Sequence, residues 1–108
     1  MALLCSYLFI LISAVSIRVL PAALLAGQPM RVTCSVPRRA ENRKLTIAVE
    51  GYWTSEYPLD GEDSPAIFQK VYDRVPCGVE AVSCTLEDNT GKVRRAALPV
   101  YVSGCDER

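Results

Sequence analysis

The chain contains no histidine among its 108 residues. Histidine is the usual general base near neutral pH and the commonest metal ligand in proteins, so the familiar hydrolase arrangements are excluded. Neither sign of charge is in excess, because 12 basic residues balance 12 acidic ones. No overall field therefore attracts nucleic acid or an anionic membrane surface, and we expect neither as a partner.

Motifs that carry chemistry are equally scarce. The sequence has no glycine-rich phosphate loop, no G-x-S-x-G elbow and no C-x-x-C pair. Zinc is disfavoured, because structural zinc sites use paired cysteines or histidines. We therefore assign no catalytic residue, no metal ligand and no cofactor, and we expect that the protein is not an enzyme.

Two charged stretches are predicted to be solvated turns. The segment "PLDGEDSP" brings Asp60, Glu62 and Asp63 close together, but it lacks the spacing of a calcium-binding loop. A turn built on Asp60 and the following glycine is favoured over a calcium site. The basic segment "RRAENRK", residues 38–44, has no interleaved aromatic residue, which favours a turn over phosphate binding.

The N-terminal segment, residues 1–16, is uncharged and predominantly apolar. Its apolar run is shorter than the roughly 20 residues that a membrane-spanning helix needs, which predicts a signal peptide. Small residues at Ala14 and Ser16 favour cleavage after Ser16, with cleavage after Ala14 or Ala26 as alternatives. Because the segment lacks the usual basic start, an uncleaved membrane anchor is a further alternative. We expect residues 17–108 to form one secreted or extracytoplasmic domain.

The rest of the chain alternates with a period of two, which is typical of strands with one buried face. Alternating runs start at Met30, Leu45, Ala66, Val82 and Ala96, and an edge strand is expected around Pro21. The turn residues "DNTG" predict a hairpin between the last two runs. We expect an all-β, two-sheet antiparallel sandwich of six to eight strands.

The hairpin register follows from the centre of this turn. A hairpin centred between Asn89 and Thr90 places Cys84 opposite Arg95 on the returning strand. Residues that lie opposite each other in an antiparallel pair share one face of the sheet.

The chain from about residue 16 to residue 102 resembles an immunoglobulin-like or fibronectin-III-like domain of exported, bacterial-type proteins. The segment "GQPMRVTCSV" is similar to the strand that carries the first core cysteine, and "LTIAVEG" to the strand after it. The segment "CGVEAVSCTLEDNTGKVRRAALPVYV" is similar to the hairpin that carries the second core cysteine. The resemblance implies an immunoglobulin-like β-sandwich.

The cysteines predict a disulfide framework. Cys5 lies in the signal segment, and the remaining four form an even set in an exported domain, where disulfides persist. An extended strand from Cys77 to Cys84 is roughly 23 Å long, far beyond the limit of about 7 Å between the Cα atoms of a disulfide. With the fold that the resemblance implies, Cys34 pairs with Cys84 across the sheets, and Cys77 pairs with Cys105.

A group of aromatic residues stands above the background. The segment "GYWTSEYPLDG" carries Tyr52, Trp53 and Tyr57 on an expected loop, and such amphipathic aromatic residues are typical of binding surfaces. We take these three residues as a candidate binding loop. In the alternative, Trp53 folds inward and fills the end of the core.

The resemblance implies a non-catalytic exported module that binds an unidentified protein or glycan through its loops or a sheet edge. The alternative is a structural or spacer domain of the cell envelope. We expect a monomer or a weak oligomer, with no membrane contact beyond the signal or anchor segment.

The first prediction concerns export. Intact-mass measurement of the exported protein should show the loss of residues 1–16, because this uncharged apolar segment has the properties of a signal peptide. A soluble cytosolic product that retains Met1 and Cys5 would contradict the prediction.

Overall fold

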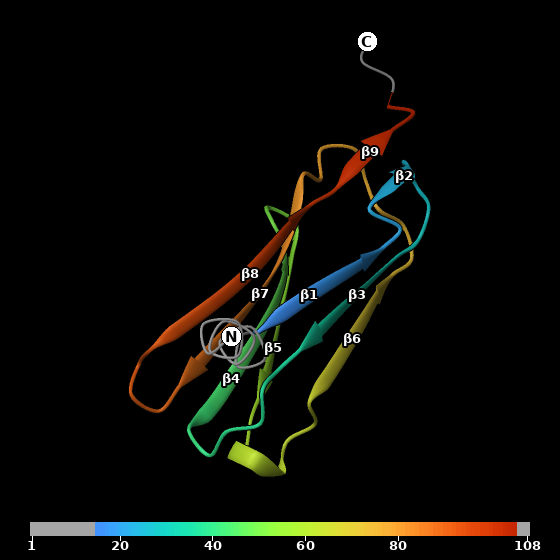
Figure 1. The fold of residues 1–108 in the computed structure, drawn as a ribbon. Coiled ribbons are helices and arrows are strands. Elements are labelled where there is room, and N and C mark those ends of the chain that lie inside the picture. The colour runs from blue at the N-terminus through green and yellow to red at the C-terminus, as the bar shows by residue number, and fades with distance from the viewer. Residues whose placement is uncertain (1–14, 106–108) are drawn as a thin grey trace, which may run out of the picture.

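The computed structural model describes residues 15–105, and these residues form strands connected by turns (Figure 1). The strands are β1 (Ser16–Leu20), β2 (Ala23–Leu25), β3 (Met30–Ser35), β4 (Asn42–Val49), β5 (Trp53–Pro58), β6 (Ile67–Tyr72), β7 (Ala81–Asp88), β8 (Val93–Pro99) and β9 (Tyr101–Ser103). A short 3₁₀ helix, η1 (Gly61–Asp63), follows β5, and the described residues contain no α-helix. The expected all-β class is confirmed.

The strands belong to three sheets. A three-stranded antiparallel sheet has the order β1-β3-β6, and a four-stranded antiparallel sheet has the order β5-β4-β7-β8. A short parallel pair joins β2 to β9. Figure 1 shows β1, β3 and β6 running together on one side of the molecule, with β2 and β9 beside each other near the C-terminal end.

One hydrophobic core contains residues from both large sheets. The alternating residues of the central strands β3, β4 and β7 supply most of the fully buried side chains, which have almost no exposed surface: Met30, Val32, Cys34, Leu45, Ile47, Val49, Val82, Cys84 and Leu86. Burial of β-branched and aliphatic side chains along one face of each strand stabilises these sheets. The same alternation leaves the opposite face of each sheet toward solvent.

Two disulfides are present, and they are the pairs expected from the sequence. Cys34 of β3 is bonded to Cys84 of β7, with 6.1 Å between their Cα atoms. Cys77, in the connection before β7, is bonded to Cys105 beyond β9, with 5.8 Å between their Cα atoms. Such bonds are typical of proteins from oxidising compartments, which is compatible with an extracellular protein. Cys5 lies outside the described residues.

The N-terminal boundary of the domain stays a prediction. Most of the expected signal peptide, residues 1–14, lies outside the described residues. Ser16 is the first residue of β1 and pairs with Ser35, so cleavage after Ser16 falls inside this strand. In the described part of the chain, no helix has the length and apolar character to cross a membrane.

The hairpin between β7 and β8 differs from its expected register by one residue. Cys84 lies opposite Ala96, not Arg95. The side chain of Asp88 shifts the turn, because its Oδ1 accepts hydrogen bonds of 2.9 Å from the backbone N–H groups of both Thr90 and Lys92. A shift of one residue exchanges the two faces of a strand, so Ala96 packs against the core and Arg95 is exposed.

The expected aromatic loop is in fact a strand. Residues Trp53–Pro58 form β5, which pairs with β4 at the edge of the four-stranded sheet. A tight turn at Gly51, with a φ angle of 84° that favours glycine, reverses the chain between the two strands. The prediction of a loop was wrong, because β5 alternates as a strand does. One face is polar, and the other carries the aromatic residues.

The second prediction concerns the disulfides. Replacing Cys34 and Cys84 together by alanine should lower the free energy of unfolding by about 4 kcal/mol in the chain-entropy model. The same replacement of Cys77 and Cys105 should cost about 3.5 kcal/mol, because the loop is shorter. Urea denaturation measures both values. If either double variant unfolded at the same urea concentration as the parent protein, the disulfide in question would not stabilise the fold.

Candidate functional site

The outward-facing side chains of β1, β3 and β6 form a single surface, which we call the outer face. They alternate along each strand with side chains that point toward the core. The strand register arranges them in three rows across the sheet: Ser16, Ser35 and Ile67; then Arg18, Thr33 and Gln69; then Leu20, Arg31 and Val71. None of these nine residues is acidic.

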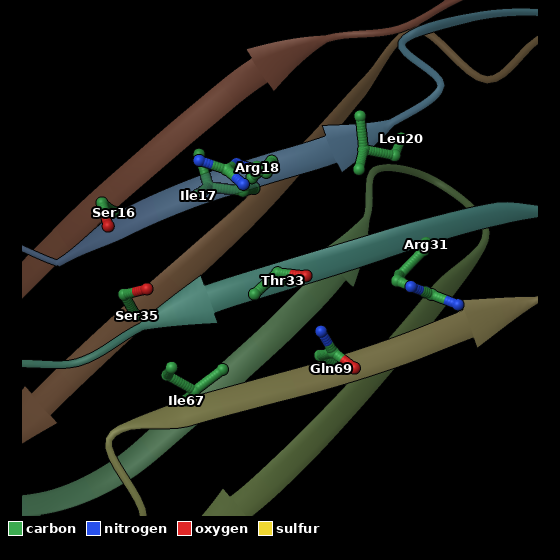
Figure 2. Close-up of a pocket in the computed structure, with 9 residues that line it drawn as sticks. All are labelled: Ser16, Ile17, Arg18, Leu20, Arg31, Thr33, Ser35, Ile67 and Gln69. Atoms are coloured by element: carbon green, nitrogen blue, oxygen red, sulfur yellow. The ribbon is translucent and has the colours of Figure 1, made fainter.

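A hollow of about 590 Å³ lies on the outer face, and Figure 2 shows its lining residues on all three strands. Arg18 comes from β1 and Arg31 from β3, the central strand. Serine and threonine hydroxyl groups, together with the amide of Gln69, contribute most of the other polar groups. The hollow is therefore open, basic and rich in hydrogen-bond donors.

The two arginines are diagonal neighbours in the sheet. Arg18 lies opposite Thr33, and Arg31 is two residues from Thr33 on the same strand. Diagonal neighbours in an antiparallel pair are roughly 7–8 Å apart, which long side chains can span. In Figure 2 the guanidinium of Arg31 points toward β6, so one anionic group contacts both guanidinium groups only after Arg31 turns toward Arg18.

Charges on the outward side of the four-stranded sheet, in contrast, are paired. The Nζ atom of Lys44 lies 3.6 Å from a carboxylate oxygen of Glu87 and 3.9 Å from one of Glu56. The guanidinium of Arg95 lies 2.8 Å from the carboxylate of Glu50. Lys44 and Arg95 on this side of the molecule thus each have an acidic partner.

The carboxylate of Glu50 is held in its charged form by two donors. The hydroxyl of Ser83 donates a hydrogen bond of 2.7 Å to Oε2, and Arg95 donates one of 2.8 Å to the same atom. These bonds, that from Ser83 first, lower the pKa of Glu50 below its ordinary value. Within residues 15–105, neither Arg18 nor Arg31 forms an ion pair of this kind.

The chemistry of the outer face suits an oxyanion. A guanidinium group presents several N–H donors in a planar arrangement that matches a carboxylate or phosphate. Hydroxyl groups beside it donate further hydrogen bonds. The polar positions of "SIRVL" and "MRVTCS" carry both arginines, but the sequence does not show that they are neighbours, so this site was not predicted.

Only two of the three aromatic residues of the predicted binding loop lie together: the ring centroids of Tyr52 and Trp53 are 6.1 Å apart. Tyr57 is half-buried and packs against Phe68 of β6, with 5.3 Å between the ring centroids. The hydroxyl of Tyr52 donates a hydrogen bond of 2.8 Å to the carbonyl oxygen of Cys77. Trp53 lies at the edge of the core.

Trp53 covers a buried tyrosine. Its ring stacks on that of Tyr72 with a centroid distance of 5.1 Å and an interplanar angle of 10°. Trp53 is 38% exposed, whereas Tyr72 is only 7% exposed. Burial raises the pKa of the Tyr72 hydroxyl above its ordinary value. Trp53 therefore forms the rim of the core rather than its interior.

The acidic segment forms a turn. Asp60 immediately precedes the 3₁₀ helix η1 and Asp63 is its last residue, and the backbone N–H of Asp63 donates a hydrogen bond of 3.0 Å to the carbonyl oxygen of Asp60. The described residues contain no group of three or more potential metal ligands among His, Cys, Asp and Glu that could hold an ion.

No protein-family model and no curated protein matches the chain. Among solved structures, the chain is similar to the superoxide reductase (neelaredoxin) from Ignicoccus hospitalis, with a TM-score of 0.62 and 18% identity over 83% of this chain and 80% of that chain. For the E23A form of that protein, the TM-score is 0.61 and the identity 12%, over 84% of this chain and 82% of that chain. At these identities the likeness shows a shared fold.

This finding corrects three expectations. The resemblance to immunoglobulin-like or fibronectin-III-like modules is wrong, because the structural neighbours are superoxide reductases. The function taken from that resemblance, a non-catalytic exported module that binds a protein or glycan, is contradicted with it. The expectation that the protein is not an enzyme is contradicted as well, because these neighbours are reductases. Strand alternation and cysteine spacing recur in many β folds, so they do not identify a family.

The third prediction concerns Trp53. Replacing Trp53 by alanine should lower the free energy of unfolding by about 2 kcal/mol, less than the 3–5 kcal/mol typical of a fully buried aromatic residue. The loss arises from the uncovered ring of Tyr72 and the lost aromatic stacking. Urea denaturation measures it, and Trp53→Phe, which retains a stacking ring, is the control. An unchanged stability would show that the indole does not pack on Tyr72.

Proposed function

We propose that the protein binds a small organic anion on the outer face of the three-stranded sheet. The observation that carries this proposal is the pair Arg18 and Arg31, set among hydroxyl groups in a hollow whose lining residues include no carboxylate. We also infer that the two large sheets form a sandwich, which is supported by the Cys34–Cys84 bond between them and by their common core.

Arginine side chains favour an anionic ligand for two reasons. Each guanidinium keeps its charge at all physiological pH values, and its donors match the two oxygens of a carboxylate. On an open surface, water and salt screen this attraction. We therefore expect weak binding, with a dissociation constant of about 0.1–1 mM, that weakens further as the salt concentration rises.

The proposal rests on this surface and not on the names of the structural neighbours. The activity named for those proteins is superoxide reduction. In residues 15–105 the four cysteines are joined in disulfides, and no group of three or more His, Cys, Asp or Glu side chains could hold a metal ion. The described residues therefore offer no donor set typical of a redox metal.

The fourth prediction is a binding experiment with citrate, a soluble polycarboxylate. Backbone amide resonances of the labelled protein are followed during titration at constant ionic strength. The largest changes should occur in β1, β3 and β6. Changing both Arg18 and Arg31 to glutamine should weaken binding at least tenfold, because both charged donors are lost.

A matched variant separates a specific site from general charge attraction. Changing Arg38 and Arg39 to glutamine removes the same charge from the connection between β3 and β4, outside the lining of the hollow. This variant should bind citrate as the parent protein does. Equal weakening in both double variants, or changes spread over the whole chain, would contradict the proposed site.

A further inference from the structure

An apolar groove continues the outer face at one end. Its volume is about 300 Å³, and its lining residues are Leu20, Pro21, Pro29, Met30, Arg31 and Val71. Leu20 and Arg31 line the basic hollow as well. The charged and apolar regions therefore adjoin each other at these two shared residues, which Figure 2 shows on β1 and β3.

Two apolar side chains of this groove are largely exposed to solvent. Leu20 is 57% exposed and Val71 is 51% exposed. They lie on either side of Arg31 in the same row of the sheet. A cationic group between two exposed aliphatic side chains combines the two contacts that an amphiphilic anion makes with a protein.

We propose that the anion bound by this protein is an amphiphile, a carboxylate attached to an aliphatic chain. The carboxylate lies between Arg18 and Arg31, and the chain lies over Leu20 and Val71. This inference rests on the proposed function and names the class of ligand.

The register of the strands sets the direction of the ligand. The row that contains Arg18 and the row that contains Leu20 are separated by two residues, which is about 7 Å along an extended strand. Pro29, which immediately precedes β3, continues the apolar surface beyond the row that contains Leu20. A headgroup at the row that contains Arg18 thus directs its chain toward the N-terminal end of β3.

The size of the groove favours a short chain. A volume of about 300 Å³ is at the lower end of the range for small-molecule sites. Each methylene group that is buried fully should tighten binding roughly fourfold, and each that is half-buried roughly twofold. Affinity should therefore rise with chain length until the groove is covered.

The test compares three probes that separate the charge from the chain. Octanoate has both, butyrate has the carboxylate with a short chain, and 1-octanol has the long chain without a charge. Amide titrations should show that octanoate binds at least tenfold more tightly than either of the others. The changes should include the residues of the groove as well as those of the hollow.

Two matched variants locate the chain of the ligand. Changing Leu20 and Val71 to serine should reduce octanoate binding to the level of butyrate. Because Leu20 also lines the hollow, the single change Val71→Ser is the variant that should weaken octanoate binding while citrate binding stays unchanged. Changing Leu25 and Val93 to serine is the control, because these residues are also 53% exposed but lie outside the groove. The control variant should bind octanoate as the parent protein does.

The other outcomes overturn the inference in distinguishable ways. If octanoate bound no better than butyrate while citrate still bound at the arginines, the assignment of the ligand as an amphiphile would be wrong, and the proposed binding of a small organic anion would stand. If 1-octanol bound as tightly as octanoate, and the glutamine variant of both arginines made no difference, both proposals would fail. If sedimentation equilibrium showed a dimer that the two serine substitutions dissociate, a second copy would occupy the groove.

Discussion

The bond between Cys34 and Cys84 constrains the whole arrangement. It joins the central strand of the three-stranded sheet to an inner strand of the four-stranded sheet, and both cysteines are fully buried. Because successive side chains of a strand point to opposite faces, burial of Cys34 places Thr33 and Ser35 on the outer face. Arg31 shares that face, since it is separated from Thr33 by two residues. The core bond thus fixes the orientation of the candidate site.

The outward surfaces of the two large sheets show how a chain without net charge can present a charged surface. On the four-stranded sheet, Lys44 and Arg95 form ion pairs with neighbouring glutamates. On the three-stranded sheet, Arg18 and Arg31 stand among neutral residues. Total charge reports on long-range attraction, whereas binding of a small anion depends on donors within a few ångströms.

The local patterns predicted most of the strands, but they did not predict the edge strand β5 or the register of the β7–β8 hairpin. Alternation correctly indicated β3, β4 and β7, and the cysteine pairs were those expected. Strand β5 was taken for a loop, since its outward residues are polar and its aromatic residues pack on β6. The register of the β7–β8 hairpin was wrong by one residue, because the carboxylate of Asp88 organises a longer turn than "DNTG" indicated. The family was wrong because none of these patterns is specific to one.

The sequence by itself determined which residues of each strand share a face, because that property depends only on the period of the backbone. It placed the side chain of Arg31 on the face opposite to that of Cys34, and the side chain of Arg18 on the face opposite to that of Val19. Only the tertiary structure decided that these two arginines are neighbours, since β1 and β6 pair with β3 through contacts distant in the sequence. Register between distant strands is set by packing of the entire core, and the hollow and its apolar groove exist only once that register is formed.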